Sequence, residues 1–324
     1  MAQATPAAGI APREQATLEK YLDPKVLARI QRFDLRTRLI VEGFISGFHR
    51  SPFRGLSVEF AQHREYSPGD DLKHLDWKVY SRSDKFFIKQ YEEETNLRAT
   101  FVVDASESMR YRGSEGERLS KFQYAACVAA ALSHLLCRQQ DAVGLVTFDE
   151  ELRHVLPPSA HPQQLKNLIH LLEDESQSLK AKTSLEHICR QVAHQLSRRG
   201  VVCLLSDLFV EEEGLFRGLQ MLAHRGHDVL ALQVLDEDEL TFPFDGNILF
   251  RGLEAAGQAL VQPQALRQGY LEAINRFTAS VHRRCIQNRI QYKLVNTSQN
   301  LGMVLSEFLA ARHEMGRTGA NKRR

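Results

Sequence analysis

Three oxygen-bearing side chains follow the first strongly apolar run of the chain. Asp104, Ser106 and Ser108 come directly after Ala99–Val103. Alternate side chains of an extended segment point to the same side, so one carboxylate and two hydroxyls can meet at one point. Such hard oxygens suit Mg²⁺, or Mn²⁺ or another divalent cation, and the two neutral hydroxyls leave the charge poorly compensated. A metal site here would need a further acid, whereas the alternative is that Asp and Ser only form a turn or a helix cap.

The elements that must position this loop alternate as apolar strands and amphipathic helices from Leu97 onward. This alternation predicts an α/β domain in which a doubly wound, mostly parallel sheet carries helices on both faces. The expected strands are Ala99–Val103, Val143–Phe148, Arg153–Leu156, Val201–Ser206, Val229–Leu235 and Gln291–Val295. The expected helices are Ser120–Cys137, Leu185–Leu196, Leu215–Ala223, Leu271–Val281 and Leu301–Leu309.

The remaining segments are divided by their composition. Residues 1–12 are rich in Ala, Pro and Gly and are predicted to be disordered, whereas 13–96 should hold leading helices and then a small β-rich module. The α/β domain is expected over 97–315, with a hairpin excursion at Asp236–Pro263. Residues 316–324 are predicted to form a disordered basic tail.

Two distant residues can complete the metal loop. Ligands of open α/β sheets gather where strands end, at the switch in strand order. Thr183 lies in a polar loop that opens a helix, and Asp207 directly follows the apolar run Val201–Leu205. Together they would add a hydroxyl and a carboxylate. Each also has a purely structural explanation, because Thr183 can cap its helix and Asp207 can turn the chain after its strand.

The five residues together resemble a known site. In order and spacing, Asp104, Ser106, Ser108, Thr183 and Asp207 resemble the metal-ion-dependent adhesion site (MIDAS) of von Willebrand factor A domains. The resemblance implies that these side chains bind Mg²⁺ directly or through water. It also implies that an Asp or Glu of a partner protein takes the open coordination position.

The segment upstream of the metal loop carries a second and more specific resemblance. From about Leu35 to Arg312 the chain resembles a bacterial family named domain of unknown function fifty-eight. The signature comprises Gly47 to Gly55, Glu59, Phe60, Arg64, Tyr66, Gly69, Asp70, Asp71, Asp76 and Trp77. The resemblance implies a von Willebrand factor A-like domain with an N-terminal β-rich insertion, often partnered with a MoxR-type AAA+ ATPase in the assembly or maturation of other proteins. It implies no reaction.

The upstream segment also invites a chemical interpretation, because carboxylates and His74 gather within a few residues of one another. Nearby basic residues can neutralise these acids, so salt bridges and turn caps compete with a hydrolytic metal site. A third interpretation is a surface that docks a partner beside the metal loop. The candidate docking residues are His49, Ser51, Arg64, Asp70, Asp71, Asp76 and Trp77.

Composition excludes several classes of protein. The 324 residues are 43% hydrophobic and 25% charged, as in ordinary globular domains. No apolar run is long enough to cross a bilayer and the N-terminus lacks a signal pattern, so a cytoplasmic protein is expected. The net charge of +2 argues against a specific nucleic-acid binder. The 5 cysteines are dispersed without a CxxC pair, which indicates reduced core residues.

Three functional hypotheses follow. The first is a nonenzymatic interaction protein whose Mg²⁺ completes its coordination with an acidic residue of a client, acting with a MoxR-type ATPase and without a small-molecule substrate. The second is a haloacid dehalogenase-type phosphatase with Asp104 as nucleophile, although Ser106 replaces the usual acid/base Asp. The third is a nucleic-acid accessory protein acting through the basic tail. The sequence contains no phosphate-binding loop of the Walker type, so nucleotide hydrolysis would have to come from a partner.

Overall fold

The chain forms two compact units, one of Met1–Gly47 with Leu97–Arg324 and one of Phe48–Asn96. The computed structural model describes residues 22–48, 63–65, 87–89, 97–113, 118–175, 185–246, 248–251 and 258–309. In the smaller unit, β1 (His63–Glu65) pairs antiparallel with β2 (Phe87–Lys89), and Arg64 is opposite Ile88. The other candidate docking residues lie outside the described residues.

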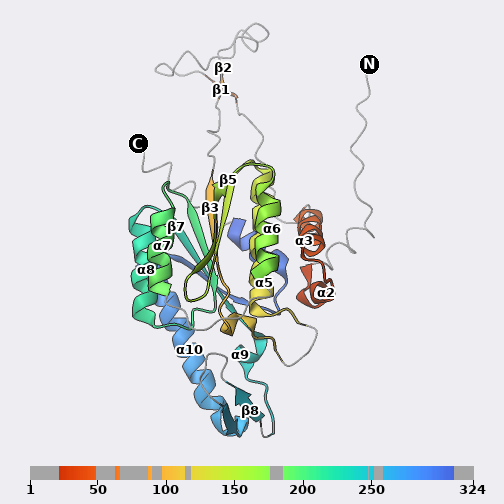
Figure 1. Ribbon diagram of the computed structural model, residues 1–324, viewed down its shortest axis with the longest axis vertical. Helices are drawn as coiled ribbons and strands as arrows, with labels where there is room; N and C mark the ends of the chain where they lie inside the picture. The colour runs from red at the N-terminus through yellow and green to blue at the C-terminus, as the bar shows by residue number, and fades with distance from the viewer. Residues whose placement is uncertain are drawn as a thin grey trace. The chain divides into compact units, whose positions relative to one another are not determined.

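The larger unit is built on one six-stranded sheet (Figure 1). Its strands are β3 (Arg98–Asp104), β4 (Ala142–Phe148), β5 (Leu152–Ser159), β6 (Val201–Ser206), β7 (Asp228–Leu235) and β10 (Gln291–Asn296). Their order is β10-β7-β6-β3-β4-β5, and every pairing is parallel except the antiparallel pair of β4 and β5. The predicted doubly wound, mostly parallel sheet is therefore confirmed. The strand order reverses between β3 and β6, which is where such sheets bind ligands.

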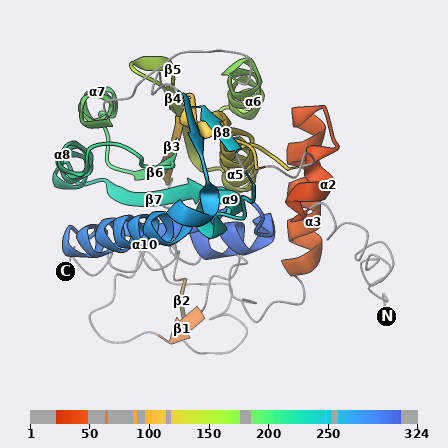
Figure 2. The same cartoon turned by 90° about the horizontal axis from the view of Figure 1, so that it is seen from below.

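Helices cover both faces of this sheet (Figure 2). One layer contains α7 (Leu185–Gln195), α8 (Glu212–His224) and α10 (Pro263–Gln287), and the other contains α5 (Lys121–Arg138), α6 (Gln164–Glu175) and a helix over 301–309. Side chains alternate between the two layers along β3. Val102 packs in the core with Ile188 and Leu219, whereas the ring of Phe101 lies 6.0 Å from that of Phe308.

The central helix α5 owes its start to a complete capping box. The Ser120 side chain accepts from the Gln123 backbone N–H, and the Gln123 side chain accepts from the Ser120 N–H. Most of the helix is buried, so its small Ala side chains allow close packing on the sheet. The first residue of α5, Lys121, lies at the carboxyl end of the sheet, where it reaches Asp207 directly after β6.

The leading helices α2 (Pro24–Ala28) and α3 (Phe33–Phe48) belong to the larger unit, whereas sequence composition grouped them with the β-rich module. Ile40 and Val41 of α3 are buried, and the Arg36 guanidinium approaches the Cys127 thiol of α5 at 4.0 Å. Within the described residues, every helix is too short or too polar to cross a membrane.

The segment Asp236–Pro263 differs in part from its prediction. The hairpin is present, because β8 (Ile248–Arg251) pairs antiparallel with β9 (Gln258–Val261). Its first residues instead form a short helix, α9 (Glu237–Thr241), with a capping box from Asp236 and Glu239. Pro263 begins α10 rather than ending the excursion, since proline fits the first turn of a helix.

Candidate metal centre

Two neighbouring strand ends bring Asp104 and Asp207 together at the switch point. Asp104 is the last residue of β3, and Asp207 directly follows Ser206, the last residue of β6. The parallel pairing matches Val103 with Leu205, so the residues that follow are neighbours across the two strands. The Ser206 hydroxyl donates to Asp104 Oδ2 at 2.5 Å, which joins the ends directly.

The loop after β3 brings three oxygen-bearing side chains together. The Ser106 backbone N–H donates to Asp104 Oδ1 at 2.9 Å, and the hydroxyls of Ser106 and Ser108 lie 3.1 Å apart. Ser108 begins η3 (Ser108–Arg110), a short 3₁₀ turn that closes the loop. Asp104 and Ser106 are each 2% exposed. One carboxylate and two hydroxyls thus lie together at the carboxyl end of the sheet.

Asp104 is a buried acid that accepts hydrogen bonds and forms no ion pair with any of the described residues. Burial, and then the charge of Asp207, raise the pKa of Asp104 from 3.8 to about 7. A cation placed beside this carboxylate would reverse both effects.

Asp207 already has an internal cation. Lys121 Nζ lies 2.9 Å from Asp207 Oδ2 and 2.7 Å from Glu239 Oε1, and the Lys121 side chain is 1% exposed. Burial alone would lower the pKa of Lys121, but the charges of Asp207 and Glu239 raise it above its ordinary value. The other oxygen of Asp207 accepts from the Phe209 backbone N–H at 3.1 Å. Lys121 is therefore a tethered ammonium beside the candidate metal site.

A second buried acidic group lies at the end of β7. Asp236 is fully buried and accepts from the Thr297 hydroxyl at 2.9 Å and the Gly113 N–H at 3.3 Å. Arg118 lies 3.7 Å from Asp236 and 3.1 Å from Asp238. Because each acid has a basic or hydroxyl partner, this cluster acts as a structural clamp for the loop after η3.

The donor set fits a hard divalent cation. Asp104, Ser106 and Ser108 offer a carboxylate and two hydroxyls, and Asp207 stands at the adjoining strand end. Thr183, the remaining predicted ligand, lies outside the described residues. No group of three or more His, Cys, Asp or Glu side chains suited to a metal occurs in the described part of the chain. The oxygen chemistry here therefore favours Mg²⁺ over zinc.

Comparison with known proteins assigns the family. The sequence model described as "Protein of unknown function DUF58" matches residues 62–280, which is more than half of the chain. The chain belongs to this DUF58 family. An uncharacterized protein of Mycobacterium bovis, Mb1516, is 25% identical over 264 residues, which cover 81% of each chain.

Two solved structures are similar to this DUF58 chain at low identity. The conserved hypothetical protein BatB from Bacteroides thetaiotaomicron has a TM-score of 0.46 at 17% identity, over 67% of this chain and 99% of BatB. The SpRpn10 VWA domain has a TM-score of 0.37 at 13% identity, over 65% of this chain and 95% of that domain.

Sequence reasoning missed the three residues that surround the DUF58 candidate centre. Ser206 could have been noticed, because it is a polar residue at the end of an apolar strand. Lys121 and Glu239 gave no comparable signal. Lys121 is 86 residues from Asp207 and 118 from Glu239 in the sequence, so only the fold brings their charges together.

Proposed function

We propose that this chain is a nonenzymatic, metal-dependent interaction protein that captures an acidic residue of a protein partner. The observation that carries the proposal is the buried Asp104 carboxylate, which lies beside two serine hydroxyls at the switch point without an ion-pair partner among the described residues. A bound cation stabilises a buried carboxylate most when the carboxylate has no other ion-pair partner.

In this proposal Mg²⁺ is held by Asp104, Ser106 and Ser108, with Thr183 and Asp207 contributing directly or through water. When bound, the ion supplies a Lewis-acidic position that a partner carboxylate can fill. The chain's own residues set the geometry. The Ser106 N–H and the Ser206 hydroxyl fix the two oxygens of Asp104, and Lys121 holds Asp207 in place.

The residues around Asp104 support binding better than turnover. A phosphatase of the haloacid dehalogenase type needs an acid/base carboxylate two residues after its nucleophile, and Ser106 stands there. The family resemblance supports a MoxR-type AAA+ ATPase as the partner, with this chain acting as an adaptor that presents a client protein for assembly or maturation.

The test is a binding measurement between this chain and a MoxR-type ATPase or its client. Since an ATPase itself needs Mg²⁺, chelation alone is ambiguous, and the decisive comparison is Asp104→Ala against wild type in the same Mg²⁺ buffer. We expect at least a tenfold loss of affinity, about 1.4 kcal/mol. Asp174→Ala is the matched control, because its side chain is 55% exposed on α6. Unchanged affinity of Asp104→Ala in this Mg²⁺ buffer would overturn the proposal.

A further inference from the structure

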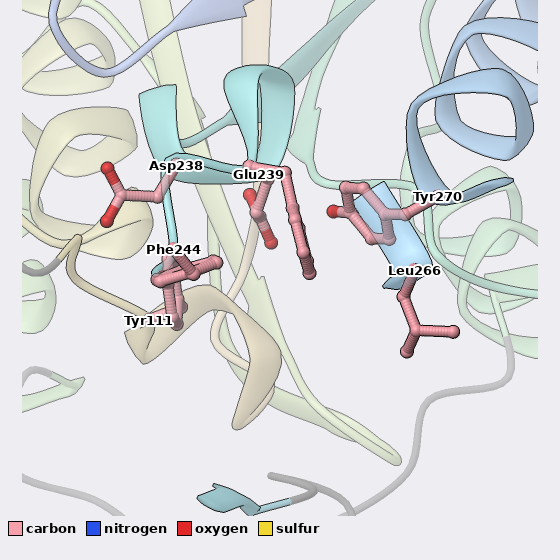
Figure 3. A pocket seen from close by; sticks show the side chains of 7 residues that line it. Tyr111, Asp238, Glu239, Phe244, Leu266 and Tyr270 are labelled. Atoms are coloured by element: carbon pink, nitrogen blue, oxygen red, sulfur yellow. The ribbon is translucent and has the colours of Figure 1, made fainter. Parts of the chain in front are cut away.

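A pocket of about 370 Å³ opens beside the candidate metal centre (Figure 3). It is lined by Tyr111, Asp238, Glu239, Phe242, Phe244, Leu266 and Tyr270. Tyr111 follows η3, the acids belong to α9, and Leu266 and Tyr270 belong to α10. Lys121 links the pocket wall to the end of β6, because it forms ion pairs with Glu239 on the wall and with Asp207 at the strand end. Its volume suits a single small ligand or a side chain.

Aromatic rings form most of the pocket wall. The ring of Phe242 meets that of Phe244 edge-on at 5.1 Å and that of Tyr270 at 4.6 Å. Phe242 ends α9 in the left-handed region at φ 47, a conformation that is costly for a bulky side chain. The conformation is held in place because the Phe242 N–H donates to the Asp238 carbonyl at 2.9 Å.

The pocket also lies in a negative field. Four carboxylates belong to the adjoining network, those of Asp207, Asp236, Asp238 and Glu239, and two cations, Arg118 and Lys121, pair with them. Of these four acids, Asp238 and Glu239 line the pocket itself. Burial, and then Asp238, Asp236 and Glu239, raise the pKa of Tyr111. Burial, and then Glu239, raise the pKa of Tyr270 to about 12.

We propose that this pocket binds the side chain of an arginine or lysine from a protein partner. Aromatic faces attract a guanidinium or ammonium group through their quadrupoles, and the carboxylates of Asp238 and Glu239 on the pocket wall add a longer-range attraction. The aliphatic part of such a side chain would pack on Leu266 and the rings. In Figure 3 Tyr270 directs its hydroxyl toward the Glu239 side of the pocket, and Leu266 lies beside Tyr270. A partner would thus present a basic residue here and an acidic residue to the metal loop.

The proposal rests on the proposed function only in taking the partner to be a protein, and its test is independent of the metal. The probes are acetyl-Gly-Arg-Gly-amide and its citrulline analogue, which has nearly the same shape without the charge. Saturation-transfer NMR with the full chain in EDTA reports the affinity of each peptide. We expect the arginine peptide to bind at least about fivefold more tightly than the citrulline peptide.

Variants of the wall distinguish this pocket from other surfaces. Tyr270→Ala should weaken binding of the arginine peptide at least about fivefold, whereas Tyr270→Phe keeps the ring and should retain it. Leu266→Lys places a positive charge at a half-exposed position and should abolish binding even if Tyr270→Ala folds poorly. Equal binding of both peptides, no saturable binding, or binding that survives Leu266→Lys would overturn the proposal. Because EDTA is present throughout, failure here would leave the metal site unaffected.

Discussion

Replacing Asp104 with Asn should stabilise the metal-free protein above neutral pH. The folded chain holds the Asp104 proton more tightly than the unfolded chain, because burial and then Asp207 raise its pKa from 3.8 to about 7. The free energy of unfolding therefore decreases as the pH rises from about 4 to about 7, and the full cost of the buried charge is present above that range. This pH dependence is the reverse of that produced by a salt-bridged carboxylate, whose contribution to stability is lost as the pH falls.

The expected magnitude follows from the two pKa values. A pKa shift of one unit corresponds to about 1.4 kcal/mol. The rise in the pKa of Asp104 from 3.8 to about 7 therefore lowers the free energy of unfolding by roughly 4 kcal/mol at pH 8. Asparagine keeps an oxygen for the Ser106 N–H but replaces the acceptor of the Ser206 hydroxyl, which costs about 1 kcal/mol. The net gain at pH 8 is then about 3 kcal/mol, and most of it should be lost at pH 5.

Urea unfolding of both proteins in EDTA measures the gain in stability at pH 8 and its decrease at pH 5. Saturating Mg²⁺ should reverse the order of the two proteins, because a bound ion stabilises only the chain that holds it. Asp174→Asn, on the exposed face of α6, should change stability by less than about 0.5 kcal/mol and serves as the control. If Asp104→Asn is less stable than wild type at pH 8 in EDTA, or if their difference does not vary with pH, the electrostatic argument is refuted.

Three further predictions concern the surroundings of the site. Lys121→Met should lower the free energy of unfolding in urea by about 3–5 kcal/mol, because it leaves the buried Asp207 and the partly exposed Glu239 without this cation. Lys293→Met removes an exposed pair with Glu307 and should lower it by less than about 1 kcal/mol, so similar losses in the two variants would count against the internal cation. Gly113→Ala should lower the free energy of unfolding by about 1–3 kcal/mol, since its Cβ would lie 2.6 Å from Asp236 Oδ1. Gly269→Ala lies in α10, where its Cβ meets nothing within 4 Å, and should raise the free energy of unfolding. A thiol reagent should label the native chain at no more than one cysteine, the partly exposed Cys137, because the other four are buried, and labelling of several thiols in the native state would be inconsistent with the core.

The strands could be predicted from the sequence because their signal is local. β4 and β6 are buried along their whole length and β3 is buried after its first residue, and each appears as an apolar run that is followed by a polar residue. The oxygen loop after β3 was visible for the same reason, since its alternation needs only adjacent residues. The start of α10 was missed because its first turns are largely exposed and carry no apolar periodicity.

The charges around the site could not be predicted, because they depend on residues far apart in the chain. Lys121 appears in the sequence as an ordinary first residue of a helix, and α9 appears as an acidic loop. Only the packing of α5 on the sheet brings the Lys121 ammonium to Asp207 and Glu239. The aromatic pocket depends likewise on α9 and α10 converging from both sides of the hairpin.

The most direct test of metal dependence is a titration of the full chain with Mn²⁺, which can replace Mg²⁺ at oxygen sites, followed by electron paramagnetic resonance. Wild type should bind one ion per chain, Mg²⁺ should displace it, and Asp104→Ala should bind none, while Asp174→Ala binds as wild type does. A wild-type chain that binds no Mn²⁺, or an Asp104→Ala variant that binds it equally well, would contradict a metal centre at the end of β3.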